Sequence, residues 1–243
     1  MKCVFSRTCG IALAAMLALA GCFSESTQAE AVNQTAVPSI AALAPAQTSA
    51  PTPAAPTLNV REGVHYTVIS PPIPTQAPQG KVEVVEMFWY GCPHCYTLEP
   101  TIHRYLQSKP DNVVFQQVPS TLSPRWAYHA KLFYVGKMLD PNGQKQVHNK
   151  IFEALQKQRR QINNDDAMIR FFGEQGFTAE QVTKALQSME MQAMLARSDE
   201  VGKGSKADSV PVIIVNGKYM TSPSKVGSED GLLQVINHLT KLK

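Results

Sequence analysis

Residues 81–96 read KVEVVEMFWYGCPHCY, and this stretch decides the fold. Val82 to Phe88 is an apolar run rich in strand-forming residues, and two cysteines follow it after a short loop. Pro93 suits the first position of a helix, where its missing N–H leaves no intrahelical bond unmade. We therefore predict a buried strand, a sharp turn, and a helix from Pro93 to about Ser108, with a kink at Pro100.

The segments on either side of this stretch complete an α/β pattern with a long helical insertion. The block from Pro124 to about Gly202 has helical periodicity and is too long for a crossover, so it predicts an inserted domain of several helices. Asn216-Gly217 between apolar runs is a strong hairpin signal. The remaining expected elements are strands at His65–Ser70, Val113–Val118, Pro211–Val215 and Lys218–Thr221, and a helix at about Ser228–Leu242.

The first 58 residues do not have the pattern of a folded domain. Residues 1–21 have a basic start and a short apolar run, and Leu-Ala-Gly then precedes Cys22. A helix needs about 20 apolar residues to cross a bilayer, so we expect a cleaved export signal. The four residues form a lipobox, with Cys22 as the site of lipidation; the alternative is an ordinary signal with a chance cysteine. Residues 22–58, rich in Ala, Pro, Thr and Ser, predict a disordered tether.

Processing at that site simplifies the cysteine count. The chain has five cysteines, of which Cys3 and Cys9 lie in the signal and Cys22 takes the lipid. Cys92 and Cys95 are then the free thiols of the mature chain. A net charge of +4 without a long basic run gives no reason to expect a nucleic-acid partner.

Cys92-Pro93-His94-Cys95 at the start of a helix favours redox exchange. Cys92 at the N-cap faces unsatisfied N–H groups and the positive end of the helix dipole, which stabilise a thiolate, so it is the candidate nucleophile. His94 adds positive charge when it is protonated, and Cys95, one turn later, is the candidate resolving thiol. As a mere staple, a four-residue loop contributes only about 1.9 kcal/mol. Zinc needs about four ligands, which makes a metal site the weaker alternative.

Three further features are candidates for the site. Glu86 lies in a strand that is apolar on both faces, so its pKa should be raised and it is placed to relay protons to the cysteines; the alternative is a Glu that reaches water. Val210-Pro211 opens a strand, and base rates favour a trans bond there. Phe88, Trp89 and Tyr90 are aromatic candidates for a peptide groove, although Phe88 suits the core better.

These residues resemble the DsbA family of periplasmic disulfide oxidases over residues 60–243. The features that carry the resemblance are Val85-Glu86-Met87-Phe88, Cys92-Pro93-His94-Cys95-Tyr96, Val210-Pro211 and Val215-Asn216-Gly217-Lys218-Tyr219. The resemblance implies a thioredoxin fold (59–122 and 204–243) with an inserted helical domain (123–203). It implies a cis Pro211, Cys92 as the attacked and attacking sulfur, Cys95 as the resolving sulfur, and substrate contacts at Val210, Pro211 and Pro93.

The resemblance also implies partners and a location. Substrates would be reduced or unfolded exported proteins that contain cysteine, and a quinone-linked membrane oxidase resembling DsbB would reoxidise the pair, with no cofactor beyond the redox-active disulfide. The place of work would be the periplasm, with the chain anchored to a bacterial membrane by its lipid. Some relatives have a lysine near the buried Glu, which Val113–Val118 does not offer. The rival functions are an envelope reductase or isomerase and a redox-inactive lipoprotein chaperone.

Overall fold

The computed structural model describes residues 57–242. The expected signal segment (1–21), Cys22, and all but the last two residues of the expected tether (22–58) lie outside the described residues. Leu58 already contacts the domain, because its N–H donates to Gln234 Oε1 at 2.7 Å. Within 57–242, no helix combines the length and the apolar character that crossing a bilayer requires.

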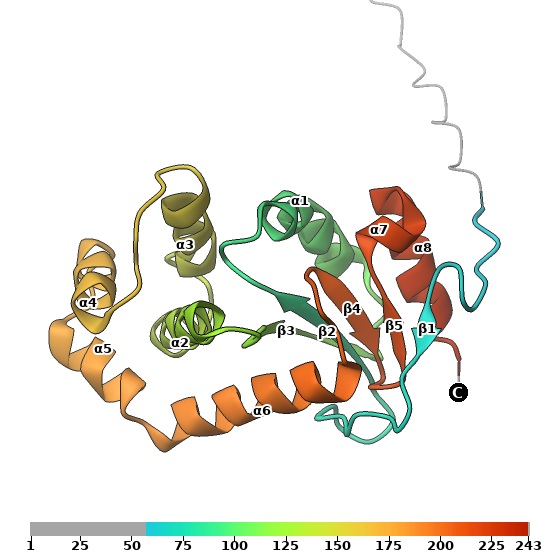
Figure 1. The fold of residues 1–243 in the computed structure, drawn as a ribbon, viewed down its shortest axis with the longest axis horizontal. Coiled ribbons are helices and arrows are strands. Elements are labelled where there is room, and N and C mark those ends of the chain that lie inside the picture. The colour runs from blue at the N-terminus through green and yellow to red at the C-terminus, as the bar shows by residue number, and fades with distance from the viewer. Residues whose placement is uncertain (1–56, 243) are drawn as a thin grey trace, which may run out of the picture. The chain divides into compact units, whose positions relative to one another are not determined.

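A five-stranded mixed sheet forms the centre of the domain, with the strand order β1-β5-β4-β2-β3 (Figure 1). Strand β2 pairs in parallel with β3 and antiparallel with β4. Val113–Pro119 matches its expected strand, whereas the expected strand at 65–70 shrinks to two residues at the sheet edge, because the chain turns at residues 63–65 and bends again at residues 70–71. The strands are β1 Thr67–Val68, β2 Val82–Phe88, β3 Val113–Pro119, β4 Val212–Val215 and β5 Tyr219–Thr221.

Helices cover both faces of this sheet and form a separate block at one end, as Figure 1 shows. The helices are α1 Pro93–Ser108, α2 Pro124–Leu139, α3 Val147–Gln156, α4 Asp165–Glu174, α5 Ala179–Leu186, α6 Met189–Ser205, α7 Pro223–Val226 and α8 Glu229–Leu239. The helical block α2–α6 is the expected insertion, and its last helix ends two residues later than the expected boundary at 203. Side chains that accept from the backbone cap α2, α4, α5, α6 and α8 at their first turns.

Strand β2 is buried on both faces, as its apolar run predicts. Val84 packs in a cluster with residues of α1 and α8, whereas Val85 and Met87 pack on the other face with residues of α6. Glu83 lies on the α6 face, where Arg197 pairs with it at 2.9 Å and both side chains are buried. The two faces of β2 therefore join α1 and α6 to one central strand.

Candidate active site

The two cysteines lie where β2 ends and α1 begins. Cys92 is the N-cap of α1 in an extended conformation, and Pro93 occupies the first helical position, as the sequence predicts. The side chain of Cys92 is 9% exposed and that of Cys95 is 0% exposed. Both are free thiols in this structure. Only Cys92 is therefore within reach of a large substrate.

The surroundings of the two sulfurs shift their pKa values in opposite directions. The pKa of Cys92 falls from 9.0 to about 6, chiefly because the Cys95 side chain donates to its sulfur, with smaller help from the backbone N–H groups of Cys95 and His94. The charge of the exposed His94 ring lowers this pKa least of these causes, so the helix start matters more than the imidazole. Burial, followed by the contact with Cys92, raises the pKa of Cys95. Cys92 is a thiolate at neutral pH and Cys95 is a thiol.

The loop before β4 lies against Cys92. Met87 at the end of β2 pairs with Val212 at the start of β4, so the residue before β4 meets the residues after β2. Cys92 Sγ lies 3.4 Å from the Val210 carbonyl oxygen, to which the sulfur donates when it is protonated. The Val210-Pro211 bond is cis, as the family resemblance implied and against the base rate from the sequence alone. Val210 and Pro211 thus lie beside the sulfur.

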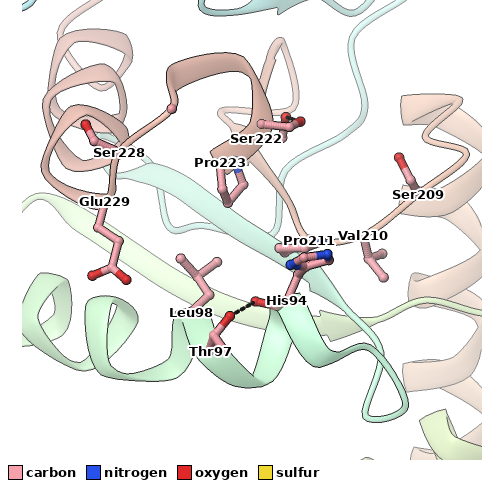
Figure 2. A pocket seen from close by; sticks show the side chains of 12 residues that line it. His94, Thr97, Leu98, Ser209, Val210, Pro211, Ser222, Pro223, Ser228 and Glu229 are labelled. Carbon is pink, nitrogen blue, oxygen red and sulfur yellow. Dashed lines mark hydrogen bonds between the residues drawn. The ribbon is translucent and has the colours of Figure 1, made fainter.

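A pocket of about 520 Å³ opens between this loop, α1 and the start of α8 (Figure 2). His94 and Leu98 of α1 line this pocket together with Val210 and Pro211 of the loop before β4. Pro93 is exposed and does not line it. Its other lining residues are mostly small and polar, namely Thr97, Ser209, Ser222, Pro223, Ser224, Gly227, Ser228 and Glu229.

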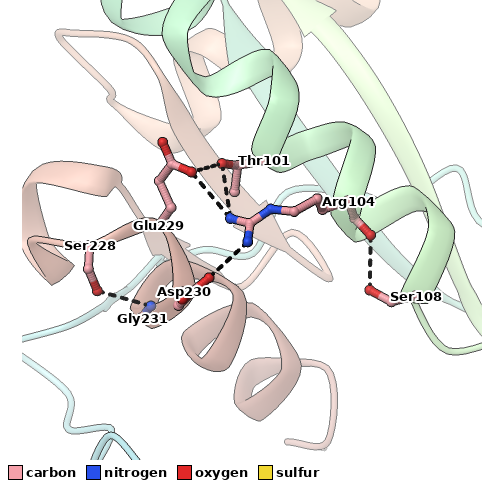
Figure 3. A network of polar contacts seen from close by, with 7 residues as sticks. All are labelled: Thr101, Arg104, Ser108, Ser228, Glu229, Asp230 and Gly231. Carbon is pink, nitrogen blue, oxygen red and sulfur yellow. Dashed lines mark hydrogen bonds and ion pairs between the residues drawn. The ribbon is translucent and has the colours of Figure 1, made fainter. Parts of the chain in front are cut away.

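A polar network fixes the wall of this pocket (Figure 3). Arg104 of α1 pairs with Asp230 at 3.0 Å and with Glu229 at 3.2 Å, both in the first turn of α8. Thr101 donates a short hydrogen bond to Glu229. Because all these contacts join α1 to the start of α8, they hold the pocket's two sides together.

Of the three aromatic residues Phe88, Trp89 and Tyr90 at the end of β2 and just after it, Trp89 is the one partly exposed. Its ring stacks on Trp126 at 4.5 Å between centroids, and its Nε1–H donates to His129 Nδ1 at 3.0 Å. Burial lowers the pKa of His129 to about 4, which keeps that nitrogen a neutral acceptor. Phe88 and Tyr90 are buried. Tyr90 packs into the core shared with the helical block and lines the pocket between β3, α2 and α3, whereas it does not line the pocket beside Val210 and Pro211.

Glu86 is fully buried, which confirms the strand pattern and contradicts the alternative of a Glu that reaches water. Burial and then the charge of Glu99 raise its pKa from 4.5 to about 8, although a hydrogen bond from Gln117 opposes this rise. Its Oε1 has no hydrogen-bond partner among the described residues. The acid is therefore largely protonated at neutral pH.

Three neighbours of Glu86 escaped sequence reasoning. Gln117 Nε2 lies 3.0 Å from Glu86 Oε2 and 3.1 Å from Glu99 Oε1, and His148 Nε2 lies 3.2 Å from Glu99 Oε2. Glu99 follows Cys95 by one helical turn, so the spacing offered a signal that it shares the buried face. Gln117 and His148 come from other elements and left no such signal. Within 57–242, no cluster of metal-ligating side chains was found.

Comparisons with known proteins agree with this geometry. Residues 127–230 match the model of the DSBA-like thioredoxin domain. A thiol:disulfide interchange protein DsbA from Burkholderia cepacia is 36% identical over 78% of this chain and 86% of the relative, and one from Pseudomonas syringae pv. tomato is 34% identical over 74% and 83%. The crystal structure of Pseudomonas aeruginosa DsbA superposes with a TM-score of 0.69 at 28% identity, covering 75% of this chain and 93% of that one.

Proposed function

Because the chain belongs to the DsbA family of thiol-disulfide oxidoreductases, we propose that it donates a Cys92–Cys95 disulfide to exported proteins with reduced cysteines. The observation that carries this proposal is the asymmetry of the pair. Cys92 is 9% exposed with a pKa lowered to about 6, whereas Cys95 is fully buried. A stabilised thiolate favours the reduced form, and this makes the disulfide a stronger oxidant.

The exchange follows from this asymmetry. A substrate thiolate attacks Cys92 Sγ, the Cys92–Cys95 bond breaks, and Cys95 leaves as a thiolate that takes up a proton. A second thiolate of the same substrate then attacks the sulfur bonded to Cys92, which forms the substrate disulfide and releases Cys92 as a thiolate. The cis loop at Val210 and Pro211 lies beside Cys92 and offers backbone groups for an extended substrate chain.

Glu86 is the candidate donor of the proton that Cys95 takes up. Its pKa of about 8 leaves it protonated at neutral pH, and its charge is among the causes that raise the pKa of Cys95, after burial and the effects of Cys92. When the enzyme is reoxidised, the same acid is placed to receive the proton back.

Reoxidation requires an electron acceptor, for which we propose a quinone-linked membrane oxidase of the DsbB type. The lipobox supports attachment of the chain to a membrane on its periplasmic side, through Cys22 and the segment 22–58. Cys22→Ser should move the protein from the membrane fraction to the soluble periplasmic fraction. Recovery of this variant with the membranes at the wild-type level would contradict the anchor.

The deciding test is the reduction potential of the pair in the full chain, obtained by equilibration with glutathione buffers. A donor of disulfides should have a reduction potential well above about −180 mV. A potential near about −270 mV, as in thioredoxin, would instead indicate a reductase. Cys92→Ser should abolish exchange, whereas Cys95→Ser should accumulate mixed disulfides on non-reducing gels. Oxidation of a dithiol peptide by Cys92→Ser at the wild-type rate would overturn the proposal.

A further inference from the structure

A histidine of the helical block reaches into the redox domain. His148 belongs to α3, about fifty residues after the cysteines, yet its Nε2 lies 3.2 Å from Glu99 Oε2 and its Nδ1 lies 2.8 Å from the Tyr90 hydroxyl. Both ring nitrogens therefore contact side chains of the β2–α1 segment, one in the loop after β2 and one in α1. Neither the sequence pattern nor the exchange reaction described above assigns this residue a role.

The hydrogens around Gln117 fix how His148 meets Glu99. Gln117 Nε2 lies within 3.3 Å of Glu86, Glu99 and His148, but an amide nitrogen carries only two hydrogens. The two carboxyl oxygens accept both of them, so Gln117 has no hydrogen left for His148, and His148 Nε2 is placed to donate to Glu99. On the other side of the ring, the Tyr90 hydroxyl can either donate to Nδ1 or accept from it.

Aromatic rings surround the His148 imidazole and hold it in place. Phe88, Phe133 and Phe152 lie with ring centroids 5.5, 5.7 and 5.1 Å from that of His148, each in a T-shaped arrangement. His148 also lines a pocket of about 500 Å³ that opens between β3, α2 and α3, so solvent reaches it.

The titratable groups near His148 come from each element around it. Glu86 and Tyr90 belong to β2 and its following loop, and Glu99 and His103 to α1. On the α2 side, Lys137 and Asp140 line the same pocket. Of these acidic groups, Glu99 contacts His148 directly, and Glu86 is linked to it through Gln117.

We propose that His148 is a positioning residue of the redox site, whose positive charge balances the Glu86–Glu99 carboxyl pair and so sets the pH range over which Cys95 exchanges its proton. This inference rests on the proposed function, because it concerns the same proton. Through His148, the helical block takes part in the chemistry of the redox site. Loss of the charge leaves Glu99 uncompensated, and its repulsion then holds the proton on Glu86 to higher pH.

Two histidines on Glu99 provide a matched test. His148 is 23% exposed at 3.2 Å, whereas His103 is 54% exposed at 3.9 Å, so its charge is screened by water. In the oxidised full chain, carbon-13 NMR of labelled Glu should show that His148→Gln moves the Glu86 titration upward by about one pH unit. His103→Gln should leave it in place, and His148→Lys should restore it. Equal Glu86 midpoints in His148→Gln and wild type would overturn the inference.

The wild type offers a test that does not depend on folding of a variant. If His148 and the carboxyl pair are coupled, the Glu86 titration curve should have an inflection at the pH where the His148 ring titrates. A single-step curve without that inflection contradicts the proposal. The pH profile for oxidation of a dithiol peptide distinguishes a failure of the proposed function from a failure of this inference. If the wild type does not oxidise the peptide, the proposed function is wrong. If the wild type oxidises it and His148→Gln has the same pH profile, only the role of His148 is wrong.

Discussion

Replacement of Glu86 by Gln should stabilise the oxidised protein at neutral pH, although the site loses an acid that we assign to the reaction. Glu86 is fully buried and its Oε1 has no partner among the described residues, so ionisation there is costly. Gln keeps an oxygen that accepts from Gln117 Nε2 and cannot ionise. The change therefore removes the ionisable group while it preserves the shape of the side chain and its hydrogen bond from Gln117.

The magnitude follows from the linkage between protonation and folding. The pKa of Glu86 is about 8 in the folded state against 4.5 for the free side chain, so between these values the folded state keeps a proton that the unfolded state has lost. The free energy of unfolding then falls as pH rises, by about 1.4 kcal/mol per unit. By pH 7 the free energy of unfolding of the wild type has fallen by about 3 kcal/mol from its value at pH 4. Glu86→Gln cannot ionise at this position and should not show this fall.

Urea unfolding of the oxidised proteins between pH 4 and pH 8 measures this effect. The variant and the wild type should have nearly equal stability at pH 4, and the advantage of the variant should grow to about 3 kcal/mol at pH 7. Glu153→Gln is the control, because Glu153 is exposed and should leave the pH slope unchanged. A difference between Glu86→Gln and wild type that does not depend on pH would refute the reasoning, as would a variant less stable than wild type at pH 7.

Three other predictions test the rest of the structure. Alkylation of the reduced protein by iodoacetamide should be half-maximal near pH 6 and confined to Cys92, since burial raises the pKa of Cys95; mass spectrometry of the modified peptide checks both points. Arg197→Met should cost roughly 3–5 kcal/mol in urea unfolding because it strands the buried Glu83, and a Glu83→Gln/Arg197→Met double variant should recover much of that loss. Gly91→Ala should displace the Trp89 indole, because a Cβ there would lie 2.2 Å from its Cζ2; near-UV circular dichroism should show the loss of the Trp89–Trp126 stack, and an unchanged spectrum would contradict the contact.

The sequence predicted the parts of the site that are local in the chain. Strand β2, the loop and α1 follow from one apolar run and Pro93, and the burial of Glu86 follows from its place in that run. The cis bond at Pro211 needed the family resemblance, because local sequence favours trans. Gln117 and His148 meet Glu99 only through strand register and helix packing, which a periodicity does not specify. Features formed by residues close in the sequence were predicted, whereas contacts between residues far apart in the sequence were not, whatever their chemistry.

Strand β2 carries two buried glutamates on opposite faces, and their partners give them different roles. Glu83 faces α6 and meets the guanidinium of Arg197, a permanent charge that needs no proton to balance it. Glu86 faces α1, and the residue paired with it on β3 is Gln117. An amide satisfies one oxygen of Glu86 but supplies no charge. Burial and the charge of Glu99 raise the pKa of Glu86 to about 8, and an acid that exchanges a proton near neutral pH is what a buried leaving thiolate requires.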